Sequence, residues 1–225
     1  MAIENKVPRL RTYLEALDTY LANNLSTLTC ADILNIHKDT CWQDARNFLG
    51  TTSGITWWFS EVLFLRILLK QIEQLGGKFE RQERGTTHDI DSLVNPTLNI
   101  EVCPQLGLNL PSLSRSWRPD ITVCQGIGQE RTPRAVLEVK TWLTSTSAVD
   151  CLIKKIEAVL TDYRDIRVAF IYFSQFAEED RQRFKEIERE FGRFLALSLT
   201  ADQDRMVGKA LEEGLGLYEL RATNY

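Results

Sequence analysis

The sequence predicts an α/β fold in which a mixed sheet is flanked by helices. Ile55 to Leu75 repeats apolar residues at spacings of three and four, as one face of a helix requires. Ser147 to Tyr163 has the same periodicity and lies between two strand-length apolar runs, Ala135 to Trp142 and Val168 to Ser174. The continuous run VAFIYFS indicates a strand buried on both faces, so the helix before it is expected to join parallel neighbours.

Shorter elements are expected on both sides of this unit. Gly76-Gly77 ends the first long helix, and after it Lys78 to Arg84 and Leu98 to Val102 are both candidates for the first core strand. The pattern does not choose between them. Ile121 to Cys124 is the next strand, and the glycines and proline of QGIGQERTPR favour a hairpin loop before the strand at Ala135. Further expected elements are a helix from Glu178 to Phe191, a strand from Phe194 to Leu199, a helix from Asp202 to Glu213 and a strand from Leu217 to Leu220.

The first fifty residues are expected to form a helical lead-in. Val7 to Leu25, Cys30 to Asn35 and Cys41 to Leu49 are the expected helices, separated by Ser and Thr residues that suit helix N-caps. The segment LTCADILNI is compatible with a helix-turn-helix, although a packing subdomain is the commoner outcome of such a pattern. We therefore expect residues 1–50 to pack as a helical subdomain on a core of residues 51–225, within one structural domain.

Apolar patterning and cysteine content argue against several classes. No apolar segment reaches the roughly 20 residues of a membrane span, and the N-terminus lacks the layout of a signal peptide, so we expect a cytoplasmic protein without a membrane partner. The five cysteines include no CxxC pair, which argues against a disulfide framework and a zinc site. His37 lies between Cys30 and Cys41 at gaps that match no common zinc pattern, and His88 stands in a polar stretch.

One Pro-Asp pair and one Glu-x-Lys triplet carry the chemical signal of the chain. Pro119-Asp120 lies 18 residues before Glu138-Val139-Lys140, within the apolar runs RPDITV and RAVLEVKTW. A Glu-x-Lys triplet alone is uninformative, because about one is expected by chance in such a chain. Its context is informative, since only Pro119 among the six prolines precedes an Asp and AVLEVK places charges where a buried strand should avoid them.

These residue types suit metal-assisted hydrolysis of a phosphodiester, which needs a divalent cation, a deprotonated water and a counter-charge for the transition state. Asp120, Glu138 and the backbone carbonyl of Val139 would hold the cation, since Mg²⁺ prefers oxygen ligands. Side chains alternate across a strand, so Glu138 and Lys140 share a face, and Lys140 would orient or help deprotonate the attacking water. The alternative is a solvated strand face or a structural ion pair, with Pro119-Asp120 as a turn.

The pair RPDITV and LEVK resembles the signature of the PD-(D/E)xK nuclease superfamily, and of type II restriction endonucleases in particular. The resemblance covers the motif residues and the order of elements only. It implies a restriction-endonuclease-like αβββαβ core: a helix, a three-stranded antiparallel meander, a crossover helix and a fourth strand parallel to the third. It also implies a Mg²⁺-dependent DNA endonuclease, with Mn²⁺ able to substitute, that leaves 5′-phosphate and 3′-hydroxyl ends. Lys140 would stabilise the developing charge beside the metal at Asp120 and Glu138.

Glu61 is a further candidate for the catalytic site. Helical spacing places four apolar side chains around its carboxylate: Trp57, Trp58, Phe64 and Leu65. The resemblance implies that the first helix supplies an acidic residue to the metal site, and Glu61 suits that role as well as it suits a structural ion pair. Glu101 and Asp91 are weaker alternatives.

Basic residues near the motif are candidates for DNA contacts. A net charge of -4 argues against a nonspecific nucleic-acid coat, but a local basic surface can still bind phosphates. The candidates are Arg115, Arg118, Arg131, Arg134 and Lys154. The segments Gly85 to Asn95, Leu106 to Trp117 and Gln125 to Arg134 are expected to be loops that hold base-reading side chains, with Arg115 or Arg131 as guanine readers, or to be ordinary surface loops.

The compact chain favours a stand-alone type II restriction endonuclease, a homodimer whose two sites address both strands of double-stranded DNA. A repair, recombination or mobile-element nuclease of the same superfamily would carry the same motif. The alternative from another class is a nuclease-like DNA- or protein-binding module that does not cleave. The intact set of Asp120, Glu138 and Lys140 argues against that module.

Overall fold

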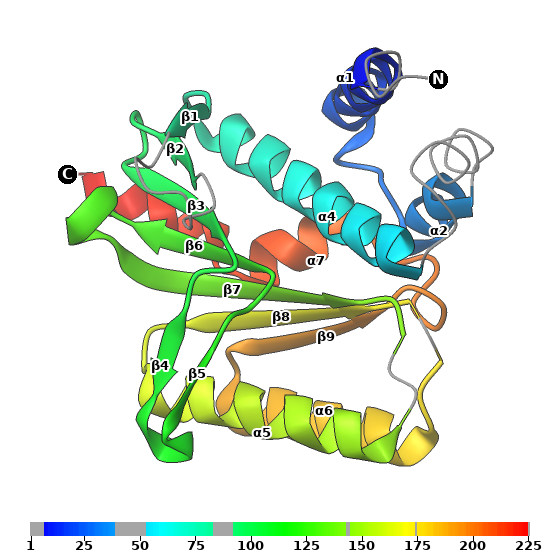
Figure 1. Cartoon of the computed structure of the whole chain (residues 1–225), viewed down its shortest axis with the longest axis vertical. Helices are drawn as coiled ribbons and strands as arrows, with labels where there is room; N and C mark the ends of the chain where they lie inside the picture. The colour runs from blue at the N-terminus through cyan, green and yellow to red at the C-terminus, as the bar shows by residue number, and fades with distance from the viewer. Residues whose placement is uncertain (1–6, 39–52, 83–91, 143–144, 174, 225) are drawn as a thin grey trace.

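A mixed sheet forms the centre of the computed structural model, which describes residues 7–38, 53–82, 92–142, 145–173 and 175–224 (Figure 1). Its strands are β1 (Glu80–Gln82), β2 (Ser92–Asn95), β3 (Ile100–Pro104), β6 (Ile121–Gln125), β7 (Thr132–Lys140), β8 (Arg167–Tyr172) and β9 (Phe194–Ser198). Within the described residues they form one seven-stranded sheet of order β1-β2-β3-β6-β7-β8-β9. Neighbours are antiparallel as far as β7, whereas β8 is parallel to β7 and β9 to β8.

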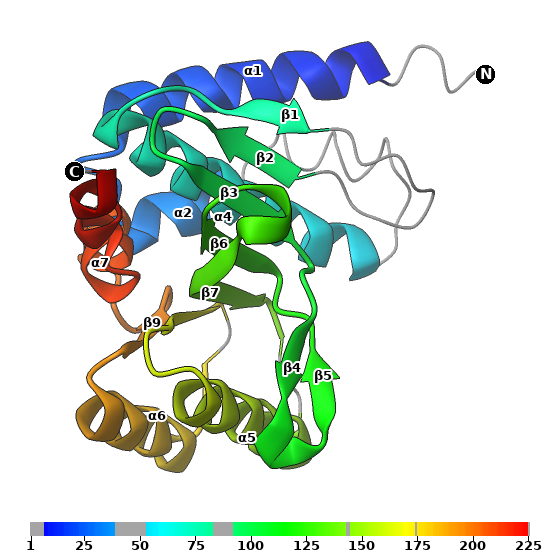
Figure 2. The same cartoon turned by 90° about the vertical axis from the view of Figure 1, so that its left-hand side faces the viewer.

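Helices cover both faces of this sheet, which confirms the expected α/β class (Figures 1 and 2). One layer contains α1 (Val7–Asn24), α2 (Cys30–Lys38), α4 (Ser53–Leu75) and α7 (Val207–Gly214). The other contains α5 (Thr146–Asp162) and α6 (Glu178–Phe191). Strand β7 serves both cores: Leu137 and Val139 are buried in the α4 core, whereas Val136 is buried in the α5 core. By the same alternation Glu138 and Lys140 lie on the α5 side.

The N-terminal helices join the α4 core. Leu17, Leu21 and Leu25 are buried in the same cluster as the side chains of α4. Leu28 accepts a hydrogen bond at 2.8 Å from the N–H of Val207, at the start of α7. The next residue, Gly208, has no room for a side chain, because an added Cβ would lie 2.7 Å from the carbonyl oxygen of Leu25. A glycine is therefore required where α7 meets the end of α1.

The expected order of helix, three antiparallel strands, crossover helix and parallel strand is present as α4, β3, β6, β7, α5 and β8. Both candidates for the first core strand form strands. Strand β3 is the one that pairs with β6, with Cys103 opposite Thr122. Strand β1 lies at the edge of the sheet, two strands away.

Several expectations are wrong in detail. The end of Gly85 to Asn95, expected as a loop, is strand β2, and the rest of that segment lies outside the described residues. Leu106 to Trp117, expected as a loop, is largely a hairpin of β4 (Leu108–Leu110), the 3-10 turn η2 (Pro111–Leu113) and β5 (Arg115–Trp117). It packs on α5 because Leu108, Leu110 and Trp117 are buried there (Figure 2). Leu217 to Leu220, expected as a strand, belongs to the 3-10 helix η4 (Leu217–Asn224), whose leucines are buried in the α4 core.

Helix α7 begins at Val207, later than the expected start at Asp202. The preceding residues form a turn, since Oδ2 of Asp202 accepts the N–H of Ser198 at 2.9 Å and its carbonyl accepts the N–H of Arg205. The expected helix from Cys41 to Leu49 lies outside the described residues, as do His88 and Asp91. Among the described helices, none combines the length and apolar character that crossing a bilayer requires.

Candidate active site

Antiparallel pairing of β6 and β7 brings the two motifs together. Ile121 pairs with Leu137, so Asp120, one residue before β6, lies opposite Glu138 near the end of β7. The backbone N–H of Asp120 donates to Oε2 of Glu138 at 3.2 Å. Both side chains are buried, with Asp120 4% and Glu138 5% exposed. The fold thus places two carboxylates side by side, at the start of β6 and the end of β7, and removes most of their contact with water.

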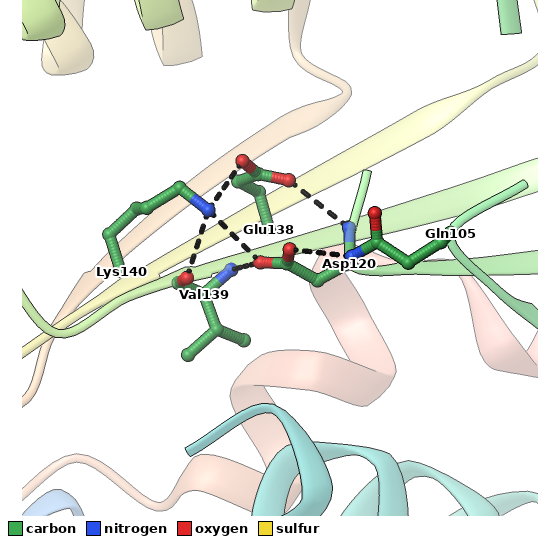
Figure 3. A network of polar contacts seen from close by, with 5 residues as sticks. All are labelled: Gln105, Asp120, Glu138, Val139 and Lys140. Atoms are coloured by element: carbon green, nitrogen blue, oxygen red, sulfur yellow. Dashed lines mark hydrogen bonds and ion pairs between the residues drawn. The ribbon is translucent and has the colours of Figure 1, made fainter. Parts of the chain in front are cut away.

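Asp120 is held by two further hydrogen bonds. Its Oδ2 atom accepts the backbone N–H of Val139 at 2.7 Å, and its Oδ1 atom accepts the side-chain amide of Gln105 at 3.2 Å (Figure 3). Gln105 follows β3 and also donates its own backbone N–H to the carbonyl of Asp120 at 3.2 Å. The carboxylate is therefore fixed from β7 on one side and from the end of β3 on the other.

The ammonium group of Lys140 lies among three oxygen atoms (Figure 3). Its Nζ is 2.7 Å from Oε1 of Glu138 and 3.2 Å from Oδ2 of Asp120. It also donates to the backbone carbonyl of Val139 at 3.2 Å. These oxygens belong to the three groups that the sequence predicts as metal ligands. The described structure thus brings all three together around one positive charge.

Burial and charge set the protonation of this cluster. Burial, with the nearby Asp120 carboxylate, raises the pKa of Glu138 to about 7, although the Lys140 ammonium opposes the shift. Burial alone would lower the pKa of Lys140, but the carboxylates of Glu138 and Asp120 raise it above its ordinary value. The ammonium is therefore strongly held, and Glu138 titrates near neutral pH.

Glu61 lies on α4, next to Asp120. Burial first, and the Asp120 carboxylate second, raise the pKa of Glu61 to about 8. Its Oε1 atom is buried and has no hydrogen-bond partner. The side chains of Trp57 and Trp58 lie outside the described part of the chain. Glu61 therefore lies adjacent to Asp120, as expected of an acidic residue that joins the site from the first helix.

Glu101 has a different set of partners. It is fully buried and pairs with Arg131, whose NH1 lies 3.0 Å from its Oε1 atom. Its Oε2 atom accepts the backbone N–H of Gly128 at 2.7 Å. These contacts fix the loop between β6 and β7.

The basic residues proposed for DNA contacts do not gather in one place. Arg118 is exposed two residues before Asp120. Arg131 directly precedes β7 and Arg134 lies near its beginning, and the six residues from Arg134 to Lys140 span about 20 Å in an extended strand. Arg115 lies on β5 with its NH2 atom 4.0 Å from Sγ of Cys151 on α5, where Lys154 is exposed. Only Arg118 is close in the chain to the carboxylates.

Sequence patterns did not reveal two residues near this site. Gln105 adopts a φ of 53°, in the left-handed region that side chains other than glycine rarely enter. The signal that would identify it is the register of β3 against β6, in which Pro104 faces Ile121. Trp142 is 61% exposed, two residues beyond Lys140. An exposed tryptophan beside a charged site is a recognisable sign of ligand contact, because most of its apolar surface would otherwise be buried.

The donor set at this site fits a hard divalent cation. Within the described residues, no group of three or more His, Cys, Asp or Glu side chains is arranged to hold a metal ion. The oxygens around Lys140 come instead from two carboxylates and one carbonyl. Mg²⁺ is commonly held by one or two carboxylates and keeps several waters, so this set suffices for Mg²⁺ but lacks the nitrogen and sulfur ligands typical of zinc.

The chain was compared with protein-family models, curated proteins and solved structures. No protein-family model matches the chain, and neither the curated proteins nor the solved structures contain a significant match. Any functional assignment therefore rests on the residues and geometry of the site.

Proposed function

We propose that this protein is a Mg²⁺-dependent DNA endonuclease with a restriction-endonuclease-like core of the PD-(D/E)xK kind. The observation that carries the proposal is the convergence of Asp120, Glu138 and the carbonyl of Val139 on the Lys140 ammonium. The order of α4, β3, β6, β7, α5 and β8 supports it.

Each residue has a role in phosphodiester hydrolysis. A divalent cation bound by Asp120, Glu138 and the Val139 carbonyl would supply a Lewis acid that stabilises negative charge on the phosphate. Gln105 and the N–H of Val139 fix the orientation of the Asp120 carboxylate. Lys140 places a positive charge beside the same oxygens, where it stabilises the charge that develops in the transition state. Glu61 has a pKa raised to about 8 by burial and the Asp120 carboxylate, so once it has lost its own proton it can accept one from the attacking water.

A nucleic-acid substrate is favoured by an aromatic and a basic residue that lie close in the chain to the carboxylates. Exposed Trp142 offers a surface on which a base or sugar can stack, and Arg118 offers a cation for a phosphate. Double-stranded DNA, a homodimer and a type II restriction role follow from the resemblance of the motif. A repair, recombination or mobile-element nuclease of the same superfamily, and a module that binds without cleaving, are the alternatives.

Digestion of plasmid and phage DNA with purified protein and Mg²⁺ tests the proposal. We expect cleavage that requires the metal and is lost in Glu138→Gln and Lys140→Met. Matched controls on α6, Glu190→Gln and Lys185→Met, change the same charges at exposed positions and are expected to cleave normally.

The product pattern separates the alternatives. Discrete bands indicate sequence-specific restriction, and a smear indicates a nuclease without sequence preference. Intact DNA across divalent metals, from a protein that is folded and binds DNA, would replace the nuclease with the binding module.

A further inference from the structure

A cavity lies at the same end of the strands as Lys140. It has a volume of about 190 Å³ and is lined by Gln175, Phe176, Arg181, Ser198, Thr200 and Ala201. The strand register fixes its position, because Lys140 pairs with Tyr172 in β8 and Tyr172 pairs with Ser198 in β9. Adjacent strands lie about 4.8 Å apart, so the backbone of Ser198 is about 10 Å from that of Lys140.

The cavity and the Lys140 site also share one face of the sheet. Tyr172 is buried in the α5 core, the side toward which Glu138 and Lys140 alternate. Ser198 is the register partner of Tyr172, so its side chain takes the same side. A strand of substrate lying along the carboxyl ends of β7, β8 and β9 would therefore pass from one site to the other.

Hydrogen-bond donors from Arg181, Ser198 and Thr200 line part of the cavity. The Nε atom of Arg181 is buried without a hydrogen-bond partner, while its NH2 atom lies 2.5 Å from Oε2 of Glu178. The hydroxyls of Ser198 and Thr200 lie 3.3 Å apart, and Ser198 Oγ accepts the N–H of Ala201 at 3.1 Å. Ser198 also hydrogen-bonds the side chain of Tyr172, so the hydroxyl hydrogen left over among these three groups lies on Thr200 or Tyr172. A guanidinium beside hydroxyls suits an oxyanion.

The carboxylates around the cavity limit the charge of that oxyanion. Glu178 pairs with Arg181, and Oδ2 of Asp202 accepts the N–H of Ser198. They oppose the entry of a doubly charged terminal or inorganic phosphate more than that of a singly charged phosphodiester. We infer that the cavity binds an internal phosphodiester of the substrate strand, close to the cleaved bond. This inference rests on the proposed nuclease function.

Binding of a fluorescent DNA duplex in Ca²⁺, used in place of Mg²⁺ to prevent cleavage, tests the cavity across a salt series. Arg181→Gln is expected to weaken binding several-fold and to reduce the slope of log K against log salt by about one. Arg189→Gln removes the same charge from an exposed position of α6 and is expected to change neither. Thr200→Val is expected to weaken binding without changing the slope, since it removes only a hydroxyl.

Thermal unfolding verifies that the variants are folded, and Arg181→Gln loses only a partly exposed ion pair, so its melting temperature is expected to stay close to that of the unaltered protein. Inorganic phosphate is the second probe. Competition by inorganic phosphate that depends on Arg181 would overturn the assignment to an internal phosphodiester.

The two proposals fail in different ways. If the protein cleaves DNA, and Arg181→Gln and Arg189→Gln have equal DNA affinity and salt slope, the phosphodiester-binding role of the cavity is overturned and the nuclease proposal stands. Binding that depends on Arg181, without cleavage in any divalent metal, would overturn the nuclease and leave a phosphodiester-binding cavity. A folded protein that binds no DNA would overturn both.

Discussion

The Nζ atom of Lys140 lies 2.7 Å from Oε1 of Glu138, whose carboxylate is one of the proposed metal ligands. The nitrogen also lies 3.2 Å from Oδ2 of Asp120, and both carboxylates are almost fully buried. In the metal-free protein the ammonium is therefore their counter-ion. A divalent cation that bound these oxygens would have to displace the ammonium from at least part of this cluster. Metal affinity and the position of Lys140 are thus expected to be coupled.

The first prediction concerns Lys140→Met. Removal of the ammonium leaves two buried carboxylates uncompensated, so the free energy of unfolding without metal is expected to fall by about 3 kcal/mol at alkaline pH. Ca²⁺ or Mg²⁺ can then occupy the vacated position, so either ion should raise the melting temperature of Lys140→Met more than that of the unaltered protein. Urea and thermal unfolding with and without metal measure both effects. Equal metal shifts in the two proteins would show that ammonium and metal do not compete.

The second prediction is that the metal-free protein loses stability as pH rises from 4.5 toward 8. Ordinary glutamate has a pKa near 4.5, whereas burial raises the pKa of Glu138 to about 7 and that of Glu61 to about 8. Across this range the folded state holds protons that the unfolded state has lost, so the free energy of unfolding falls with pH. The pKa of Lys140 is raised above its ordinary value of 10.5, so Lys140 does not contribute to the pH dependence of stability in this range.

Urea unfolding across this pH range measures the slope. It is expected to flatten in Glu61→Gln and to persist in the exposed control Glu190→Gln. Metal affinity should change in the opposite sense, because binding requires deprotonated carboxylates and is expected to tighten and to release protons as pH rises. Calorimetry in buffers of different ionisation heat counts those protons. A metal affinity independent of pH would remove Glu138 from the ligand set.

The third prediction separates the backbone of Gln105 from its side chain. Gln105 and Ser114 both have a positive φ, 53° and 51°, where glycine is the least strained residue. Gln105→Gly and Ser114→Gly are each expected to change the free energy of unfolding by less than about 1 kcal/mol. Only Gln105→Gly removes a hydrogen bond to Asp120, so it alone should reduce kcat or metal affinity, by about tenfold or more. Equal cleavage by the two variants would show that the amide does not position the carboxylate.

The long elements of the fold were predictable because their periodicity extends over many residues. Helices α4, α5 and α6 and the buried strand β8 lie within a few residues of their expected bounds. The hairpin of β4 and β5 could not be predicted, because strands of three residues are too short to show the alternation of apolar and polar side chains. The apolar run from Leu217 to Leu220 suits a buried 3-10 turn as well as a strand. Local patterns of that length do not distinguish the two.

The candidate site likewise contains residues that local patterns predict and residues that they do not. Asp120, Glu138 and Lys140 are identifiable because charges interrupt apolar strands, and their convergence follows from one hairpin. The role of Gln105 depends on which strand lies beside β6, which is a long-range property. Arg134 is close to Lys140 in sequence but about 20 Å away, because the chain between them is extended. Sequence proximity predicts spatial proximity poorly along a strand.

The last prediction contrasts two acidic partners of arginines near the start of β7. Glu101 is fully buried and pairs with Arg131 at 3.0 Å, whereas Asp165 is 81% exposed and lies 3.7 Å from Arg134. Glu101→Gln is expected to lower the free energy of unfolding by about 3 kcal/mol, since it leaves a partly buried guanidinium without its counter-charge. Asp165→Asn should cost under about 1 kcal/mol because water screens the exposed pair. Urea unfolding compares the two, and Arg131→Gln should lose stability as Glu101→Gln does while leaving DNA affinity unchanged. A loss of DNA affinity at full stability would instead make Arg131 a DNA contact.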